Sequence, residues 1–235
     1  MPVHLHPTAP LARRALLPGD PGRALALAQL LLSEPKMFNH NRGLWGYTGA
    51  AADGELLTIQ STGMGGPSAA IVLEELCDLG LERAIRVGTC GALDPALVLG
   101  DLVIAEAALT ADGTSRALGA GERVAADATL VAALRAGAGS SARAGLVAST
   151  DLFYDRRADL AGAWQRDGAL AVEMEAATLL RVAQLRGIPM GCVLAVSDVF
   201  GADGERNRIA PDELLAAAER IGQAGAIALG AAPPD

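Results

Sequence analysis

Cysteine, lysine and aromatic residues are scarce in this chain, and long apolar runs are missing. The three cysteines are odd in number and scattered, without a Cys-x-x-Cys or Cys/His spacing, so neither a disulfide framework nor a zinc site is expected. No uninterrupted apolar run reaches the roughly 18 residues of a membrane-spanning helix. We therefore expect a cytoplasmic protein in a reducing compartment, with no membrane partner.

Positive charge is also in short supply. The formal net charge is −8 and neither end carries a block of Lys or Arg, which argues against a nucleic acid or an anionic membrane as partner. Lys36 is the only lysine, so nearly every cation is a guanidinium, a group that can hold an oxyanion with two hydrogen bonds. Any bound anion must therefore be held locally, by a few arginines.

What the chain does contain is a large apolar fraction in alternating segments. Of its 235 residues 51% are apolar, enough to bury one substantial core, so we expect a single domain over residues 1–235. Short β-prone runs alternate with longer Ala/Leu-rich segments, the pattern of an α/β sheet covered by helices. The predicted strands are 15–17, 56–60, 84–87, 102–105, 146–149 and 190–196. The predicted helices are 21–32, 67–79, 127–136, 175–186 and 211–229, with mobile loops over 113–121 and 201–207.

Glycine-rich turns follow two of the predicted strands. In the Gly19-Asp20-Pro21-Gly22-Arg23 segment, the free amides of a helix start and the side chain of Arg23 favour an anion, although a purely structural turn is an equal alternative. The turn over residues 61–68 lacks the Gly-x-Gly-x-x-Gly spacing and a Walker lysine, so it does not indicate a dinucleotide or a nucleoside triphosphate.

Arg86 stands near the end of an apolar strand that should be buried. A buried guanidinium needs an anion, either a carboxylate such as Asp101 or a bound phosphate. Thr89 would add a hydroxyl donor, and Gly88 and Gly91 would expose backbone at the carboxyl end of the strand, where ligands of open α/β sheets lie.

Carboxylates mark two further segments. Glu173 and Glu175 in Val-Glu-Met-Glu would lie on one side of an extended chain, either as favourable charges at a helix start or with one carboxylate bridging a sugar diol. Asp198 follows another apolar strand, where it would either cap a turn or donate a proton to a leaving group. An anion site beside a diol site points to phosphorolysis of a nucleoside.

Together these segments resemble the nucleoside phosphorylase family that contains the hexameric purine nucleoside phosphorylases and the uridine phosphorylases. The resemblance runs from Gly19 to about Asp198 and includes residues 41–49 and 151–154. It implies a single three-layer α/β domain around a mixed, partly closed sheet. It also implies a homo-oligomer built of dimers whose subunits complete each other's sites, usually a trimer of dimers, and the sequence leaves a smaller assembly open. Inorganic phosphate would be the co-substrate, with no cofactor.

The resemblance assigns a role to each candidate residue. The phosphate ligands would be Gly19, Arg23, Arg86 and Thr89, joined by Arg42 of the neighbouring subunit. The ribose would contact Met174, Glu175 and a histidine of the neighbour, either His4 or His6. The base would contact Cys90, Gly91, Phe153, Val172, Glu173, Ser197 and Asp198. The catalytic residues would be Arg86 and Asp198, with Asp198 protonating purine N7 and assisted by Arg206 or Arg208.

The expected function is phosphate-dependent cleavage of purine ribonucleosides and deoxyribonucleosides, giving free base and pentose 1-phosphate. Uridine phosphorylase is an alternative, but its Gln-x-Arg element after the aromatic is absent beyond Phe153, and Gly43 replaces its cation-binding glutamate, so no metal is expected. A nucleosidase would lack an arginine at the place of Arg86, and a non-catalytic nucleoside binder would not need Asp198. The sequence leaves open the preference among inosine, guanosine, adenosine and methylthioadenosine.

Overall fold

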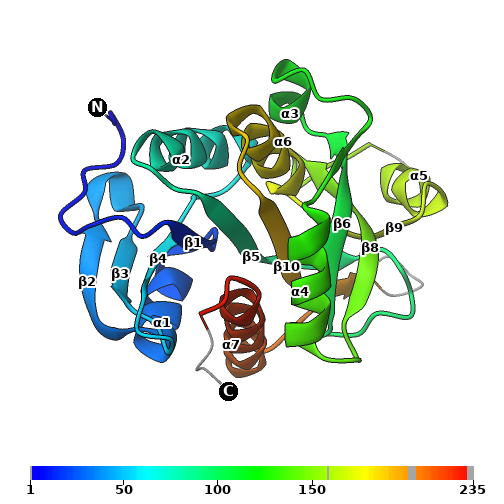
Figure 1. Ribbon diagram of the computed structural model, residues 1–235. Coiled ribbons are helices and arrows are strands. Elements are labelled where there is room, and N and C mark those ends of the chain that lie inside the picture. Colours follow the sequence, from blue (N-terminus) through cyan, green and yellow to red (C-terminus); the bar gives the residue numbers. More distant parts are fainter. Residues whose placement is uncertain (1, 158, 201–204, 232–235) are drawn as a thin grey trace.

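A mixed β-sheet runs through the centre of the molecule and helices cover both of its faces (Figure 1). The computed structural model describes residues 2–157, 159–200 and 205–231. The strands are β1 (Arg14–Leu17), β2 (Ser33–Asn39), β3 (Gly46–Ala50), β4 (Leu56–Gln60), β5 (Arg83–Ala92), β6 (Leu102–Ala111), β7 (Arg123–Ala125), β8 (Arg143–Thr150), β9 (Ala169–Glu173), β10 (Met190–Phe200) and β11 (Arg206–Arg208). The helices are α1 (Pro21–Leu31), the 3₁₀ turn η1 (Asn41–Gly43), α2 (Gly66–Asp78), α3 (Gly113–Ala117), α4 (Ala128–Ala138), α5 (Leu160–Arg166), α6 (Ala176–Arg186) and α7 (Pro211–Ala228).

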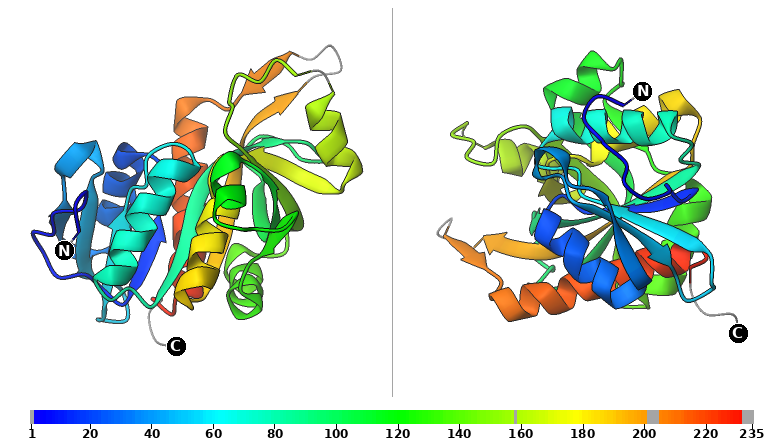
Figure 2. Two further views of the ribbon diagram at one scale, coloured as in Figure 1. Left: turned by 90° about the horizontal axis from the view of Figure 1, so that it is seen from above. Right: turned by 90° about the vertical axis from the view of Figure 1, so that its left-hand side faces the viewer.

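Five of these strands close into a barrel. β5 pairs in parallel with β10, β10 pairs antiparallel with β6, and β6 pairs in parallel with β8. β8 then pairs in parallel with β9, which returns antiparallel to β5. The strands β1, β4, β3 and β2 extend from β5 as an open wing at the other end of the molecule (Figure 2). The predicted α/β class and the partly closed sheet are therefore confirmed.

The core lies in two layers, one on each face of the sheet. Helices α2 and α6 pack against each other on one face, and α7 packs against α1 and α4 on the other (Figure 1). Close approach of α7 depends on glycine, because a Cβ at Gly222 would lie 2.2 Å from Leu27 Cδ2 and one at Gly225 would lie 2.8 Å from Leu16 Cδ2. No helix in the described ranges combines the length and the apolar character that crossing a membrane requires.

The six predicted strands and five predicted helices are all present, but several strands run further than their apolar runs suggested. β5 continues from residue 87 to Ala92 and β10 from residue 196 to Phe200, because their polar and glycine residues still pair with neighbouring strands. Strands β2, β3, β7, β9 and β11 and helices α3 and α5 were not predicted.

The loop predicted over residues 113–121 is partly wrong. Residues Gly113–Ala117 form α3, whose start is capped by the Asp112 carboxylate, which accepts a hydrogen bond from Ser115 N at 2.7 Å. In the loop predicted over 201–207, positions 201–204 lie outside the described residues, and residues 206 and 207 belong to β11.

Candidate active site

The predicted site segments meet because the strands that carry them run the same way. β1 is parallel to both β4 and β5, and β5 is parallel to β10, so the carboxyl ends of all four strands lie at one edge of the sheet. β9 reaches the same edge from the opposite direction, with Val172 paired to Gly91 of β5. Gly19, Arg23, Thr89, Glu175 and Asp198 therefore belong to one region of the fold.

Arg86 is the centre of a buried ionic cluster. Its guanidinium is 3% exposed and contacts Glu173 Oε2 at 2.9 Å and Glu175 Oε2 at 2.5 Å through Nη2. Nε donates a second hydrogen bond to Glu173, while Nη1 has no partner among the described residues. The predicted alternative partner Asp101 is wrong, since its carboxylate accepts from Val98 N instead. A buried, unused N–H beside a glycine-rich strand end is a donor available to a ligand.

The charged groups in this cluster shift one another's pKa values. Burial alone would lower the pKa of Arg86, but the carboxylates of Glu175 and Glu173 raise it above its usual value. The pKa of Glu175 is raised, because its burial and the negative charge of Glu173 outweigh the attraction of Arg86. Glu175 also accepts a hydrogen bond from Gly65 N at 2.6 Å, so the turn after β4 helps to fix this carboxylate.

Arg23 approaches the same cluster from the first turn of α1. Asp20 caps that helix by accepting from Arg23 N at 2.7 Å. Burial lowers the pKa of Arg23, and the negative charge of Asp20 opposes that shift. The positive charge of Arg86 lowers the pKa of Arg23 further, so the guanidiniums of Arg23 and Arg86 are close enough to repel each other. The Arg23 side chain makes no hydrogen bond within the described part of the chain. A Cβ at Gly19 would lie 3.2 Å from Gly63 O, so the turns after β1 and β4 are in contact.

Glu173, predicted to contact the base, has its carboxylate surrounded by protein donors. It accepts hydrogen bonds from Ser149 Oγ at 2.5 Å, Glu175 N at 2.8 Å and Ala176 N at 2.9 Å, besides Arg86. Glu173 thus caps the start of α6. This is the first of the two roles that the sequence left open for these glutamates, a favourable charge at a helix start. The neighbouring Met174 is half-buried.

Asp198 is held on both carboxylate oxygens. Ser197 Oγ donates to Oδ2 at 2.6 Å, and Arg206 Nε lies 2.8 Å and Arg208 Nη1 3.4 Å from Oδ1. The pairing of β10 with β5 shifts between Val196 and Asp198, and this irregularity brings the Ser197 hydroxyl to 3.2 Å from Cys90 O. Of the two arginines that the sequence could not separate, Arg206 makes the closer contact.

Aromatic side chains lie beside this acid. The Arg206 guanidinium sits 4.1 Å from the ring centroid of Phe153, so Phe153 and Asp198 share one arginine. A Cβ at Gly91 would lie 3.4 Å from Phe200 and 3.5 Å from Val172. Sequence reasoning missed Phe200, although its position two residues after Asp198 in a chain with 3% aromatics was a usable signal.

The remaining predicted residues are less closely tied to the cluster. Thr89 is half-buried, and its hydroxyl makes no hydrogen bond within the described ranges. Cys90 is buried and its thiol donates to Ala195 O at 3.7 Å. Arg42 is exposed in η1 with φ 58°, and His4 lies beside that turn, since Asn41 Nδ2 donates to His4 O at 2.8 Å. No hydrogen bond or ion pair in the described part of the chain joins Arg42 or His4 to Arg23, Arg86 or Asp198.

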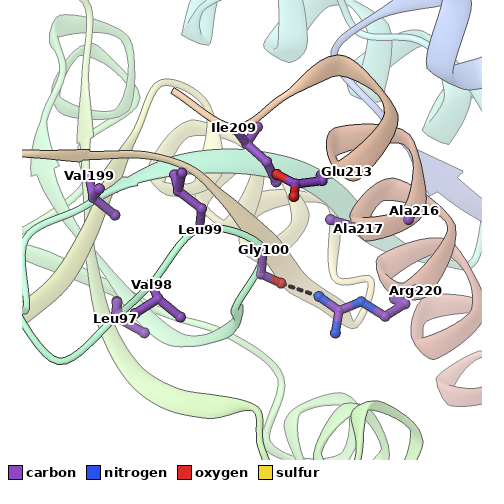
Figure 3. A pocket seen from close by; sticks show the side chains of 10 residues that line it. All are labelled: Leu97, Val98, Leu99, Gly100, Val199, Ile209, Glu213, Ala216, Ala217 and Arg220. Atoms are coloured by element: carbon purple, nitrogen blue, oxygen red, sulfur yellow. Dashed lines mark hydrogen bonds between the residues drawn. The ribbon is translucent and has the colours of Figure 1, made fainter. Parts of the chain in front are cut away.

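The ionic cluster does not line either of the two cavities described here. One, of about 640 Å³, lies between the β5–β6 connection and α7, where Arg220 donates to Gly100 O (Figure 3). Val199 and Ile209 line it, so it lies behind the β10–β11 pair rather than at Asp198. The other, of about 510 Å³, lies beside α6 and the start of α4.

Comparison with known proteins gives a consistent result. A family model described as the phosphorylase superfamily matches residues 13–231. A DeoD-type purine nucleoside phosphorylase of Geobacillus kaustophilus is 38% identical over 205 residues, which cover 84% of this chain and 86% of the relative. A second one, of Jannaschia sp., is 40% identical over 206 residues, covering 84% and 87%. A guanosine phosphorylase of Halorubrum lacusprofundi is 36% identical over 204 residues, covering 85% and 84%.

Proposed function

The chain belongs to the phosphorylase superfamily, and we propose from this that it is a purine nucleoside phosphorylase. It transfers the pentose of a purine ribonucleoside or deoxyribonucleoside to phosphate, releasing the free base and pentose 1-phosphate. Residues 1–235 act as one catalytic domain. The observation that carries the proposal is the buried Arg86, which is paired with Glu175 and whose Nη1 has no partner among the described residues, next to Arg23.

Phosphate binds between Arg23, Arg86, Thr89 and the amides after Gly19. In this position the phosphate lies beside the sugar. Glu175 binds the hydroxyls of that sugar, and Met174 packs against the sugar ring. The anion then serves as nucleophile and stabilises the positive charge that develops on the ribose as the glycosidic bond breaks. No cofactor enters this reaction, because phosphate itself is the second substrate.

The charge of the cluster indicates why one subunit is insufficient. The guanidiniums of Arg23 and Arg86 face the carboxylates of Asp20, Glu173 and Glu175, so the cluster alone has no surplus cation to offer an anion. Arg42 of a neighbouring subunit supplies it in our proposal, which fits its exposed position. We accordingly propose a homo-oligomer of dimers, up to a hexamer.

The base lies among Gly91, Val172, Phe153 and Phe200, within reach of Asp198. Asp198 donates a proton to purine N7, so that the base departs as a neutral molecule, and Arg206 and Ser197 hold the carboxyl group in place. The three cysteines are free thiols, which supports a reducing compartment such as the cytoplasm.

The direct test is consumption of inosine, guanosine and adenosine by the purified protein with and without phosphate. We expect base release that depends on phosphate and yields pentose 1-phosphate. Release without phosphate would identify a nucleosidase, and turnover of uridine in preference to every purine would identify a uridine phosphorylase. Binding without turnover in either condition would leave a nucleoside-binding protein.

A further inference from the structure

A buried carboxylate outside the phosphate cluster holds the first residues of the chain. Glu75 lies on α2, and its side chain is only 12% exposed. Its Oε1 accepts from Val3 N at 2.9 Å, and its Oε2 accepts from Leu5 N at 2.7 Å, with His4 N 3.0 Å from both oxygens. The N-terminal segment therefore lies across α2 (Figure 2).

The same carboxylate orients the His4 ring. Nδ1 of His4 lies 2.7 Å from Glu75 Oε1. Burial alone would raise the pKa of Glu75, but hydrogen bonds from Leu5, His4 and Val3 outweigh it and lower the pKa to about 2. An ionised carboxylate only accepts hydrogen bonds, so Nδ1 must carry the proton. In the neutral ring the lone pair is then on Nε2, which makes no hydrogen bond within the described residues.

The segment is also tied to the turn that carries Arg42. Asn41 Nδ2 donates to His4 O at 2.8 Å, and His6 N donates to Asn39 Oδ1 at 2.9 Å. His4 and Arg42, the residues expected to enter a neighbour's site, thus share one hydrogen-bonded framework. The ring of His6, by contrast, is exposed and has no partner in the described part of the chain.

We propose that Glu75 is a positioning residue for the ribose end of a nucleoside bound by a second copy of this chain. It fixes His4 in the Nδ1–H tautomer, so that Nε2 accepts a hydrogen bond from the 5′-hydroxyl of the substrate. Glu75 acts through His4 and sets the preference for nucleosides with a free 5′-hydroxyl over 5′-deoxynucleosides. This inference rests on the proposed function, because the hydroxyl belongs to the proposed substrate.

The test compares inosine with 5′-deoxyinosine in Glu75→Gln, His4→Ala and the double variant. The Gln amide places a donor where the segment needs an acceptor, so Glu75→Gln should lower kcat/KM for inosine about three- to tenfold, the contribution of one hydrogen bond. Turnover of 5′-deoxyinosine and the KM for phosphate should stay within about twofold. The double variant should be no worse than His4→Ala, because both changes remove one interaction.

Glu74→Gln is the matched control. Glu74 is the preceding residue of α2 and pairs with Arg186 at 3.2 Å, away from His4, so both substrates should be turned over as by the wild type. Equal losses on inosine and 5′-deoxyinosine in Glu75→Gln would show a merely structural role and overturn the inference.

A second test uses the wild-type protein, so it depends neither on the folding of a variant nor on an activity assay. The ¹⁵N chemical shifts of the His4 ring should report the Nδ1–H tautomer, and an Nε2–H tautomer would overturn the inference. If the wild-type chain shows no phosphorolysis, the proposed function fails. Normal phosphorolysis with an unchanged inosine preference in Glu75→Gln overturns this inference alone.

Discussion

Asp198 is held by groups from three places in the sequence. Ser197 precedes it in β10, Arg206 and Arg208 face it from β11, and Phe153 supports Arg206 from the segment after β8. The sequence predicted Asp198 as the acid and named Arg206 and Arg208 as the alternatives for an arginine that assists it. It could not choose between them, because the choice depends on side-chain reach: Arg206 Nε approaches to 2.8 Å, whereas Arg208 Nη1 stays at 3.4 Å.

Replacing the acid should separate chemistry from phosphate binding. Asp198→Asn retains the shape of the side chain but has no acidic proton, so kcat for adenosine should fall about 10²- to 10⁴-fold. The KM for phosphate should change less than about threefold, because Arg23 and Arg86 are untouched. Steady-state kinetics with both substrates varied would check this, with Asp78→Asn on the exposed end of α2 as control. Equal losses in turnover and phosphate affinity would count against Asp198 as the acid.

Among the elements, β5 contributes most to the candidate site. Its first half is an ordinary buried strand, and its second half carries Gly88, Thr89, Cys90 and Gly91. From the sequence these residues indicated a turn after residue 87. In the structure they remain in the strand, because β10 pairs with one side of them and β9 pairs with the end of the other. Pairing between distant segments decided where the strand ends.

The absence of a side chain at Gly88 makes room for the Arg86 guanidinium. A Cβ there would lie 2.7 Å from both Cζ and Nη2 of Arg86, closer than van der Waals contact allows. Gly88→Ala should therefore displace the guanidinium from its carboxylates and raise the Kd for phosphate roughly tenfold, since a charge-assisted hydrogen bond is lost. Titration calorimetry with phosphate would measure the change directly.

Gly121→Ala is the matched control for this substitution. Gly121 is exposed, and a Cβ there would meet no atom within 4 Å, so its phosphate affinity should equal that of the wild type. An unchanged phosphate affinity in Gly88→Ala would mean that Arg86 does not bind the anion.

At the scale of the whole molecule, our proposal divides the site between copies of the chain. His4 lies beside η1, which contains Arg42, while the Arg86 cluster and Asp198 lie at the carboxyl ends of β1, β5 and β10. A dimer with two-fold symmetry would exchange the first pair between subunits and so build two complete sites.

Mixed assemblies of inactive variants should test this division. Arg42→Ala and Asp198→Asn each damage a different contribution to the site, so a mixed dimer carries one intact site. After co-refolding in equal amounts, activity should recover to about a quarter of the wild-type value, since half of the dimers are mixed. Arg23→Ala combined with Asp198→Asn should show no recovery, because both changes affect the subunit's own part of the site. Lack of recovery in the first mixture would contradict a shared site.

The sequence by itself determined the class of fold and predicted the residues of the candidate site. Apolar periodicity located six strands and five helices, and the ordered motifs at Gly19, Arg86, Glu175 and Asp198 identified the chemistry, because those residue types are needed locally whatever surrounds them. Only the tertiary structure decided that Glu173 and Glu175, not Asp101, neutralise Arg86, and that Glu75 holds His4. These partners lie on different elements, and their distances depend on strand pairing and helix packing that no local pattern records.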